Sequence, residues 1–466
     1  MLNIYTTFFE KVSIENIPYC SWKNNHVLKD ELSGNGDIDL LVQPSCKHKF
    51  ERILSDYDFI RVSSSISEYP HIHHYYGYDE NANKFAHMHV YYKLVTGDSH
   101  LKNYRLPLES QILESSKVNQ FGISEAAAHH QMQLYILRKV IKKSSLTGIF
   151  LLIRESGDYR NEFQYISRKL TNKKVSLSLF GSNQTLQEGY SLSLKNHFYL
   201  RVFLLSWKRD VGIGGRIFQL SKRIVNKLFL KKKKSIEGSL IAIVGLDGSG
   251  KTTSVDMIHK WLSKDFNAKT FHFGRPPPTL ITLPLRMALF ARKKLGKAKP
   301  VGSLGNTSKE LNLGTIGKVR YVALAYERSV LIKKAHQYSL KGGVSILDRY
   351  PSICVGLMDS PRIPADKLSS TFSSLLYKIE STLYKSMPIA DLLFKFDVDV
   401  ENALIRNRNR IKKGKETDEE IMMRFKLNNE LEYRVQSSIK IDANNQIEQV
   451  HQLLRKYTWK HIVSTN

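Results

Sequence analysis

The pattern of apolar and polar residues divides the first half of the chain into two parts. Residues 1–120 mix short β-type runs such as Ile38–Val42 with polar loops, which is typical of an α+β domain. From Ser124 apolar residues recur at helical intervals, and similar patches continue to about Trp207. The pattern therefore predicts a helical region over residues 121–212. Its first helix has apolar positions at Met132, Leu134, Tyr135, Leu137 and Val140.

The last part of the chain, residues 238–466, alternates β-type runs with helical stretches. The first run, Leu240–Val244, precedes an amphipathic helix, and Leu392–Val398 leads into another helix that carries arginines. A short strand at Ser438–Ala443 is followed by a helix predicted over Ile447–Leu454. This alternation predicts an α/β domain.

Charge is the bulk property that departs from an ordinary globular chain. The sequence has 71 Lys and Arg residues against 43 Asp and Glu residues, a formal net charge of +28. The excess is concentrated, because residues 201–300 hold 22 basic and only 5 acidic side chains. Such a segment favours an anionic partner, namely polyphosphate, nucleic acid or an acidic membrane surface.

Residues 213–237 form a basic amphipathic linker that ends in the run Lys231–Lys234 and the turn after it. Three interpretations stay open for this linker: packing against the domain that follows, adhesion to an anionic membrane, and binding to nucleic acid. Nucleic acid is the least favoured partner, because neither an aromatic platform nor a base-reading motif accompanies the charge.

Length and composition exclude several classes of protein. The 466 residues allow roughly three domains, and 42% hydrophobic residues are typical of a globular chain. No apolar run approaches the ~18 residues of a membrane span, and the N-terminal residues lack the order of a secretory signal. Cys20, Cys46 and Cys354 are too widely spaced for a disulfide framework or a zinc knuckle. We expect a cytoplasmic protein, peripheral at the inner face of the membrane if the linker binds lipid.

A glycine-rich loop follows the first β-type run of the α/β domain. Its backbone N–H groups can surround a phosphate, and the helix that follows adds partial positive charge from its N-terminus. Lys251 should reach the β- and γ-phosphates of a nucleotide, and the Thr252 hydroxyl should coordinate Mg²⁺. A chance Gly/Ser loop is the alternative, and the spacing and both flanks disfavour it. The expected nucleotide-binding residues are Gly245, Asp247, Gly248, Ser249, Gly250, Lys251, Thr252 and Thr253.

Two further charged groups follow later β-type runs, and the first is Asp348-Arg349 after the run Gly343–Leu347. Asp348 can hold the Mg²⁺ shell or accept a proton, and Arg349 can bind a phosphate. The alternative is a plain ion pair between the two side chains. Arg406, Arg408 and Arg410 alternate near the end of a predicted helix. They can close over ATP as a lid that neutralises phosphoryl charge, or they can form a solvated basic face.

In this order the motifs resemble the thymidylate kinase family. The resemblance runs from Leu240 to the end of the sequence. It rests on the glycine loop, Asp348-Arg349-Tyr350, the strand-to-helix unit from Phe396 to Arg410, and Ile441-Asp442-Ala443. It implies a P-loop kinase fold with a parallel sheet, and Mg²⁺ with ATP as the phosphoryl donor. It also implies that Lys251 and Thr252 contact the phosphates, that Asp348 and Arg349 lie near the acceptor, and that arginines among residues 406, 408 and 410 form the lid.

The acceptor side departs from that family. Thymidylate kinases carry an Arg-Glu-Pro-Gly segment after the second strand, where this chain has Phe271-His-Phe-Gly-Arg275-Pro-Pro-Pro278. Arg275 and Arg349 are the candidate acceptor ligands. Similar kinase-like proteins are encoded among bacterial surface-polysaccharide genes, so by analogy we expect a phosphate or hydroxyl acceptor on a surface polysaccharide or a lipid-linked sugar.

The leading function is therefore an ATP-dependent phosphotransferase, and three alternatives stay open. One is a true nucleoside monophosphate kinase acting on dTMP. Another is a membrane-apposed regulatory protein that binds nucleotide without chemistry. The third is a nucleotidyltransferase that uses its kinase-like domain only as a sensor.

Two carboxylates, Asp37 and Asp39, lie two positions apart on a β-type run in the first domain. Both point to one face and can share a divalent metal. The run resembles the Asp-x-Asp strand of the polymerase β-type nucleotidyltransferase superfamily, which implies Mg²⁺ at both carboxylates. Two features depart from it: Ser21–Asn24 replaces the glycine turn, and the later strand Phe85–Tyr91 has no acid. Active nucleotidyl transfer, a degenerate binding module and an unrelated strand with surface acids all stay open.

Eight of the sixteen histidines cluster between positions 71 and 130: His71, His73, His74, His87, His89, His100, His129 and His130. A His-x-His pair on a strand puts two imidazoles on one face, an arrangement that transition metals use. Because no Glu or Cys is spaced to complete a ligand set, ordinary polar or partly buried histidines are the favoured interpretation.

Overall fold

The chain divides into two compact units, Met1–Lys232 and Lys233–Asn466. None of the described helices is long and apolar enough to cross a bilayer. Most of the predicted linker lies outside the described residues, as do Asp247 and Arg410. The computed structural model describes residues 1–64, 69, 71–97, 102, 104–143, 157–170, 202, 204–208, 217–218, 221, 234–246, 248–294, 314–365, 370–408, 417–428 and 431–466.

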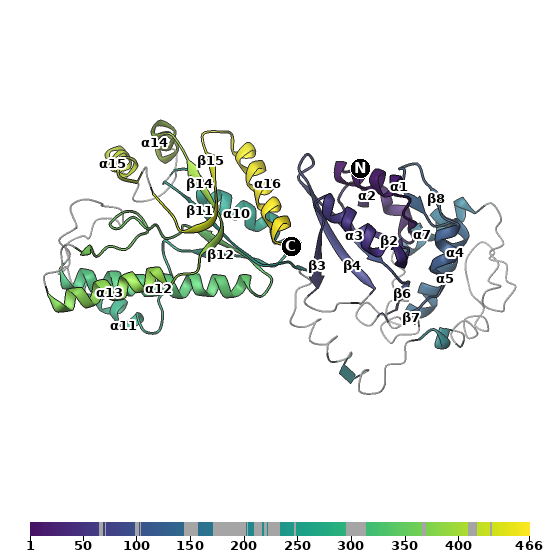
Figure 1. The fold of residues 1–466 in the computed structure, drawn as a ribbon, viewed down its shortest axis with the longest axis horizontal. Coiled ribbons are helices and arrows are strands. Elements are labelled where there is room, and N and C mark those ends of the chain that lie inside the picture. The colour runs from purple at the N-terminus through teal and green to yellow at the C-terminus, as the bar shows by residue number, and fades with distance from the viewer. Residues whose placement is uncertain are drawn as a thin grey trace. The chain divides into compact units, whose positions relative to one another are not determined.

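The first unit is built on a mixed sheet, of which β2, β3 and β4 are labelled in Figure 1. Its neighbouring strands follow the order β3-β4-β5-β2-β1-β9-β8. Strand β2 pairs parallel with β5 and antiparallel with β1, whereas β4 and β5 form an antiparallel pair. The elements are α1 (Asn3–Ile14), β1 (Tyr19–Ser21), η1 (Asn25–Val27), α2 (Leu28–Glu31), β2 (Ile38–Val42), η2 (Pro44–Cys46), α3 (Lys47–Asp56), β3 (Ile60–Ser64), β4 (Ile72–Asp79), β5 (Lys84–Tyr91), β6 (Val95–Thr96), β7 (Tyr104–Arg105), α4 (Glu109–Glu114), β8 (Lys117–Val118), β9 (Ser124–Glu125), α5 (Ala128–Lys143) and α7 (Gly157–Lys169).

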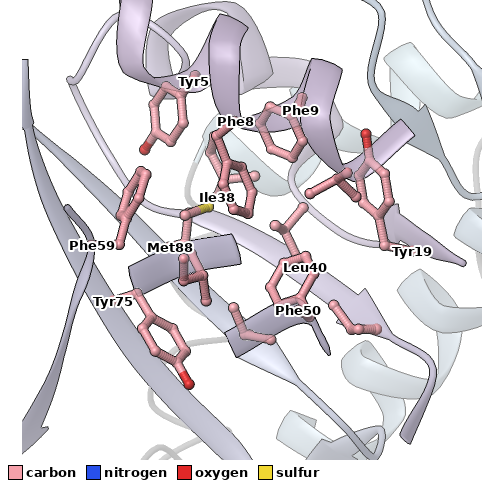
Figure 2. Packing of buried hydrophobic residues seen from close by; sticks show 14 of the residues in the cluster. Tyr5, Phe8, Phe9, Tyr19, Ile38, Leu40, Phe50, Phe59, Tyr75 and Met88 are labelled. Atoms are coloured by element: carbon pink, nitrogen blue, oxygen red, sulfur yellow. The ribbon is translucent and has the colours of Figure 1, made fainter. Parts of the chain in front are cut away.

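An aromatic core covers one face of this sheet. Alternate strand residues such as Leu40 of β2 and Met88 of β5 pack against rings from α1 and α3 (Figure 2). Phe8 of α1 meets Phe50 of α3 edge to face with ring centroids 5.5 Å apart. Burying each such side chain stabilises the fold by about 1.5–3 kcal/mol, so this face of the sheet forms the hydrophobic core. The intervening residues of β2 and β5 must therefore point to the opposite face.

That opposite face is partly apolar and partly polar. Leu41 and Tyr91, near the ends of β2 and β5, join a second buried cluster with Trp22 and with residues of α5 and α7. Asp39 and His89 alternate with core residues on the same two strands and lie directly opposite each other in the parallel register. Because successive side chains of a strand point to opposite faces, Asp39 and His89 lie together on this face, beside the apolar cluster.

The helical region begins later than predicted. Ser124 and Glu125 form strand β9, and Glu125 pairs in parallel with Ser21 of β1, so α5 starts only at Ala128. An ion pair between Arg138 and Glu162 joins α5 to α7. Strand pairing with a distant residue explains the difference, because it overrides the local helical periodicity.

The second unit contains a parallel sheet in the order β12-β13-β11-β14-β15, with every neighbouring pair parallel. The predicted α/β class with a parallel sheet is therefore confirmed. Helices α12 and α13 pack together on one face, and α10 with α16 on the other (Figure 1). The elements are β10 (Lys234–Ser235), β11 (Ser239–Gly245), α10 (Lys251–Leu262), β12 (Ala268–His272), α11 (Leu283–Lys294), α12 (Thr315–Ser339), β13 (Val344–Asp348), α13 (Thr371–Lys385), β14 (Ala390–Asp397), α14 (Val400–Arg408), α15 (Asp418–Asn428), β15 (Val435–Asp442) and α16 (Ile447–Thr465).

The central position of β11 explains its sequence. Leu240–Val244 is an unbroken apolar run because helices cover both faces of the sheet, so neither set of alternating side chains meets water. Two boundaries differ from prediction. Strand β15 begins at Val435 and α16 continues to Thr465, because tertiary packing extends elements beyond the segment whose pattern is strongest.

Candidate functional site

The topology of the second unit brings several strand ends to one point. The chain leaves β11, forms β12 and then β13 on one side of it, and crosses to form β14 and β15 on the other side. The order of connection therefore reverses at β11, and in open parallel sheets ligands bind outside the carboxyl ends of the strands at such a point. Gly245 ends β11 and Asp348 ends the neighbouring strand β13.

The loop from Gly245 to Gly250 joins β11 to α10. Gly248 and Gly250 both have φ of +89°, a left-handed conformation that glycine adopts without strain. A Cβ built on Gly248 would lie 3.1 Å from the carbonyl oxygen of Ala403, whereas one on Gly250 would meet nothing within 4 Å. The loop therefore packs against α14 on one side and leaves space in front of the N-terminus of α10.

Two polar side chains are buried within this loop region. Lys251, the first residue of α10, is only 6% exposed, and its Nζ donates a 2.6 Å hydrogen bond to the carbonyl oxygen of Leu246. Ser249 is 2% exposed, and its Oγ has no hydrogen-bond partner among the described residues. A buried hydroxyl without a partner is costly, so the loop has the chemistry of a site that an oxygen-rich anion completes.

Asp348 faces the start of α10. The Thr252 hydroxyl donates to its Oδ2 at 3.5 Å, and His272 Nδ1 lies 3.1 Å from the same oxygen. Burial raises the pKa of Asp348, but His272, Lys251 and Arg349 outweigh that effect and hold the pKa below its usual value. A hydroxyl and an ionised carboxylate so close together are oxygen donors that fit Mg²⁺.

Arg349, the residue after Asp348, has a strained backbone conformation. Its φ is +76°, its N–H donates to the carbonyl oxygen of Ile243, and its guanidinium pairs with Asp359 at 3.3 Å. Arg328, only 4% exposed on α12, pairs with the other oxygen of Asp359 at 2.8 Å. The three side chains form one charged network that orients the Arg349 guanidinium.

Sequence reasoning missed two members of this network. Arg328 and Asp359 belong to a helix and a loop that no motif marks, and a buried arginine inside a long helix has no periodic signal. His272 was also missed as a partner of Asp348. Its register, directly opposite Asp348 on the neighbouring strand, appears only once β12 and β13 are paired.

The predicted acceptor and lid arginines have different surroundings. Arg275 is exposed just after β12. Arg406 of α14 donates to the carbonyl oxygen of Ala443 at 2.8 Å, and Arg408 pairs with Asp418 of α15. Because Ala403 packs on the glycine loop, α14 lies beside that loop, while its two described arginines are engaged by protein groups.

In the first unit the structure brings Asp37 and Asp39 to one imidazole. His89 Nδ1 lies 2.8 Å from Asp37 Oδ2 and 3.4 Å from Asp39 Oδ1. Asp39 is 1% exposed and also pairs with Lys23 Nζ at 2.9 Å. Burial raises the pKa of Asp39, yet Lys23 and His89 together hold it far below its usual value.

This arrangement fits Mg²⁺ poorly. A protein ammonium already neutralises Asp39, and the strand position opposite it holds His89 instead of a third carboxylate. Mg²⁺ at Asp37 and Asp39 stays a prediction, and Lys23 would compete with the ion for Asp39.

A third imidazole joins His87 and His89. It belongs to His74 on β4, and one ligand atom from each of the three histidines lies within 4.8 Å of the others. The sequence places His74 among the clustered histidines of this domain, but its position beside His87 and His89 depends on the register between β4 and β5, which cannot be read from spacing along the chain.

A scan against protein-family models found no match, and a search of curated proteins found none either. The resemblance to thymidylate kinases therefore rests on the motifs between Leu240 and Ala443.

Proposed function

We propose that this protein is an ATP-dependent phosphotransferase whose second unit carries the reaction. One observation above all supports the proposal: the Thr252 hydroxyl and the Asp348 carboxylate lie 3.5 Å apart beside the buried Lys251, at the carboxyl edge of a parallel sheet. A glycine loop, an ammonium and two magnesium-type oxygen ligands are the groups that hold a nucleoside triphosphate.

In this proposal the groups of the loop bind the donor. Backbone N–H groups between Gly245 and Gly250 and the positive end of α10 bind phosphate oxygens, and the Ser249 hydroxyl gains the partner that it lacks. Lys251 exchanges the Leu246 carbonyl for the β- and γ-phosphates. Thr252 and Asp348 would hold Mg²⁺, which supplies positive charge between the phosphates when bound.

The acceptor binds on the other side of Asp348. Arg349 is partly exposed, and Asp359 together with Arg328 holds its guanidinium in one orientation, which suits recognition of a phosphate or another anionic group. As an alternative to holding Mg²⁺, the Asp348 carboxylate can accept a proton from a hydroxyl acceptor. The proposed acceptor is therefore a phosphate or hydroxyl on a sugar or lipid-linked sugar, with Arg275 at its outer edge.

The test compares donor binding and turnover in matched variants. We expect the wild-type chain to show a thermal shift with Mg²⁺ and an ATP analogue, and to consume ATP when a suitable acceptor is present. Lys251→Met and Asp348→Ala should each lower turnover by about 100-fold or more, because each removes a charge at the transferring phosphate. Lys260→Ala, on the exposed side of α10, should match the wild type.

Two results would contradict the proposal. One is ATP turnover that survives both Lys251→Met and Asp348→Ala, and the other is the absence of any Mg²⁺-dependent shift with nucleotide. Rapid stoichiometric conversion of dTMP to dTDP would instead identify a nucleoside monophosphate kinase, with the same donor site and a different acceptor.

A further inference from the structure

Three imidazoles converge on one face of the hairpin formed by β4 and β5. His74 and His89 are direct cross-strand partners, and His87 precedes His89 by two residues on the same strand. All three side chains therefore point to the face opposite the aromatic core. The ring centroids of His74 and His89 are 4.1 Å apart, and those of His87 and His89 are 4.5 Å apart.

One ligand atom from each of the three histidines lies within 4.8 Å of the others, and one pair of nitrogen atoms has the spacing of neighbouring metal ligands. Metal–nitrogen bonds of about 2.0–2.1 Å in a tetrahedral site keep neighbouring ligand atoms about 3.3 Å apart. His74 Nδ1 lies 3.4 Å from His87 Nε2, which is close to that separation. The three histidines are half-buried, so the site is held by the sheet but stays open to solvent.

Asp37 supplies the second feature of such a site. Its Oδ2 lies 2.8 Å from His89 Nδ1, so the imidazole donates that N–H and directs Nε2 away from the carboxylate. Ligating histidines usually donate their other ring nitrogen to a carboxylate in this way, which fixes the tautomer and raises ligand basicity.

Local charge also favours a cation here. The Asp39 charge is balanced by Lys23, whereas the half-exposed Asp37 carboxylate leaves one negative charge beside the imidazoles. Nitrogen donors select borderline d-block ions over Mg²⁺, which prefers oxygen ligands. The histidines therefore suit a different ion from the one expected at paired carboxylates.

We propose that His74, His87 and His89 bind a divalent transition-metal ion of the Zn²⁺ type, with Asp37 as the carboxylate that orients His89. Three protein ligands leave a fourth coordination position for water or for an oxygen of a ligand. This site belongs to the first unit and is independent of the proposed phosphotransfer site.

The experiment titrates the metal-free full-length chain with Zn²⁺ by calorimetry in excess Mg²⁺, and with Co²⁺ by visible absorption. We expect one tight equivalent and the absorption bands of a tetrahedral Co²⁺ complex. His74→Gln and His87→Gln should each weaken binding at least about tenfold, and Asp37→Asn should weaken it about 10–100-fold. The control His48→Gln, an exposed histidine of α3, should bind like the wild type.

Circular dichroism of each metal-free variant checks that the fold is intact, and two separate ligand variants keep the test valid if one fails to fold. The proposal is overturned if both folded ligand variants keep wild-type affinity. It is also overturned if Zn²⁺ binds only as several weak equivalents, or if excess Mg²⁺ displaces it. In each of those cases the histidines form only hydrogen bonds and ring contacts.

Discussion

At the scale of single residues, the first unit is notable for a buried ion pair. Lys23 Nζ lies 2.9 Å from Asp39 and sits over the rings of Trp22 and Tyr91, 5.1 and 5.2 Å from their centroids. Asp39 is buried and Lys23 is largely withdrawn from water, so each charge depends mainly on the other for compensation. Removing one partner is therefore far more damaging than removing an exposed charge.

Asp39→Asn should destabilise the protein by about 3 kcal/mol at neutral pH, because it leaves the Lys23 ammonium buried without a counter-charge. Urea unfolding measures the loss. Glu15→Gln, which removes a solvent-screened partner of Lys49, is the control and should change stability far less. An equal effect of the two substitutions would contradict the role assigned to the buried pair.

The same pair has a defined pH dependence. Because the pKa of Asp39 is depressed in the folded state, its contribution is fully present above the unfolded pKa, about 3.9, and is lost as pH falls further. The stability difference between wild type and Asp39→Asn should therefore shrink below about pH 4. On the way down from pH 8 it should first grow, because Asp39 helps to raise the pKa of His89 and so stabilises the protonated imidazole in the folded state.

At the scale of elements, the second unit depends on close contact between a strand and a helix end. Gly238 precedes β11, and a Cβ built on it would lie 1.6 Å from the carbonyl oxygen of Ser339, the last residue of α12. The oxygen is a backbone atom, and an added Cβ would be fixed to the backbone of residue 238, so the clash could be relieved only by moving one element relative to the other. This contact sets the depth at which α12 packs on the sheet.

Gly238→Ala should lower the free energy of unfolding by about 3 kcal/mol, because the added methyl group forces β11 and α12 apart. Chemical unfolding followed by circular dichroism measures the change. Gly314→Ala, at the N-cap of α12 with nothing within 4 Å of the added Cβ, should cost no more than about 1 kcal/mol. Similar losses in both variants would show that crowding at Gly238 is not the cause.

At the scale of the whole molecule, two units with separate cores share one chain of strong positive charge. The formal net charge is +28, and Lys231–Lys234 form its densest run. An anionic bilayer attracts nearby basic residues with about 1 kcal/mol per Lys at moderate ionic strength, and salt weakens the attraction. Membrane attachment is therefore a testable property of the full chain.

Replacing Lys231, Lys232, Lys233 and Lys234 by Gln should reduce binding to anionic vesicles by up to about a thousandfold, since four favourable charges are lost. Co-sedimentation at low and high salt measures it. Replacing four exposed lysines elsewhere in the chain (Lys29, Lys49, Lys260 and Lys341) controls for net charge. Unchanged binding by the variant, or equal loss in the control, would exclude the run as an anchor.

The sequence by itself determined the local features of this protein. An unbroken apolar run followed by glycines and Lys251-Thr252 specified a strand, a loop and a helix, because that local order has few other conformations. The alternation of apolar and polar residues around Asp39 likewise specified a strand with its carboxylate opposite the core. Both signals lie within a few consecutive residues.

Only the tertiary structure decided which distant residues meet. Lys23 at Asp39, His74 beside His87 and His272 at Asp348 each depend on strand order and register, which hydrophobic packing of the whole sheet sets. A shift of one residue would turn each of these side chains to the other face. The chemistry of both candidate sites therefore follows from register, a property that no short stretch of sequence contains.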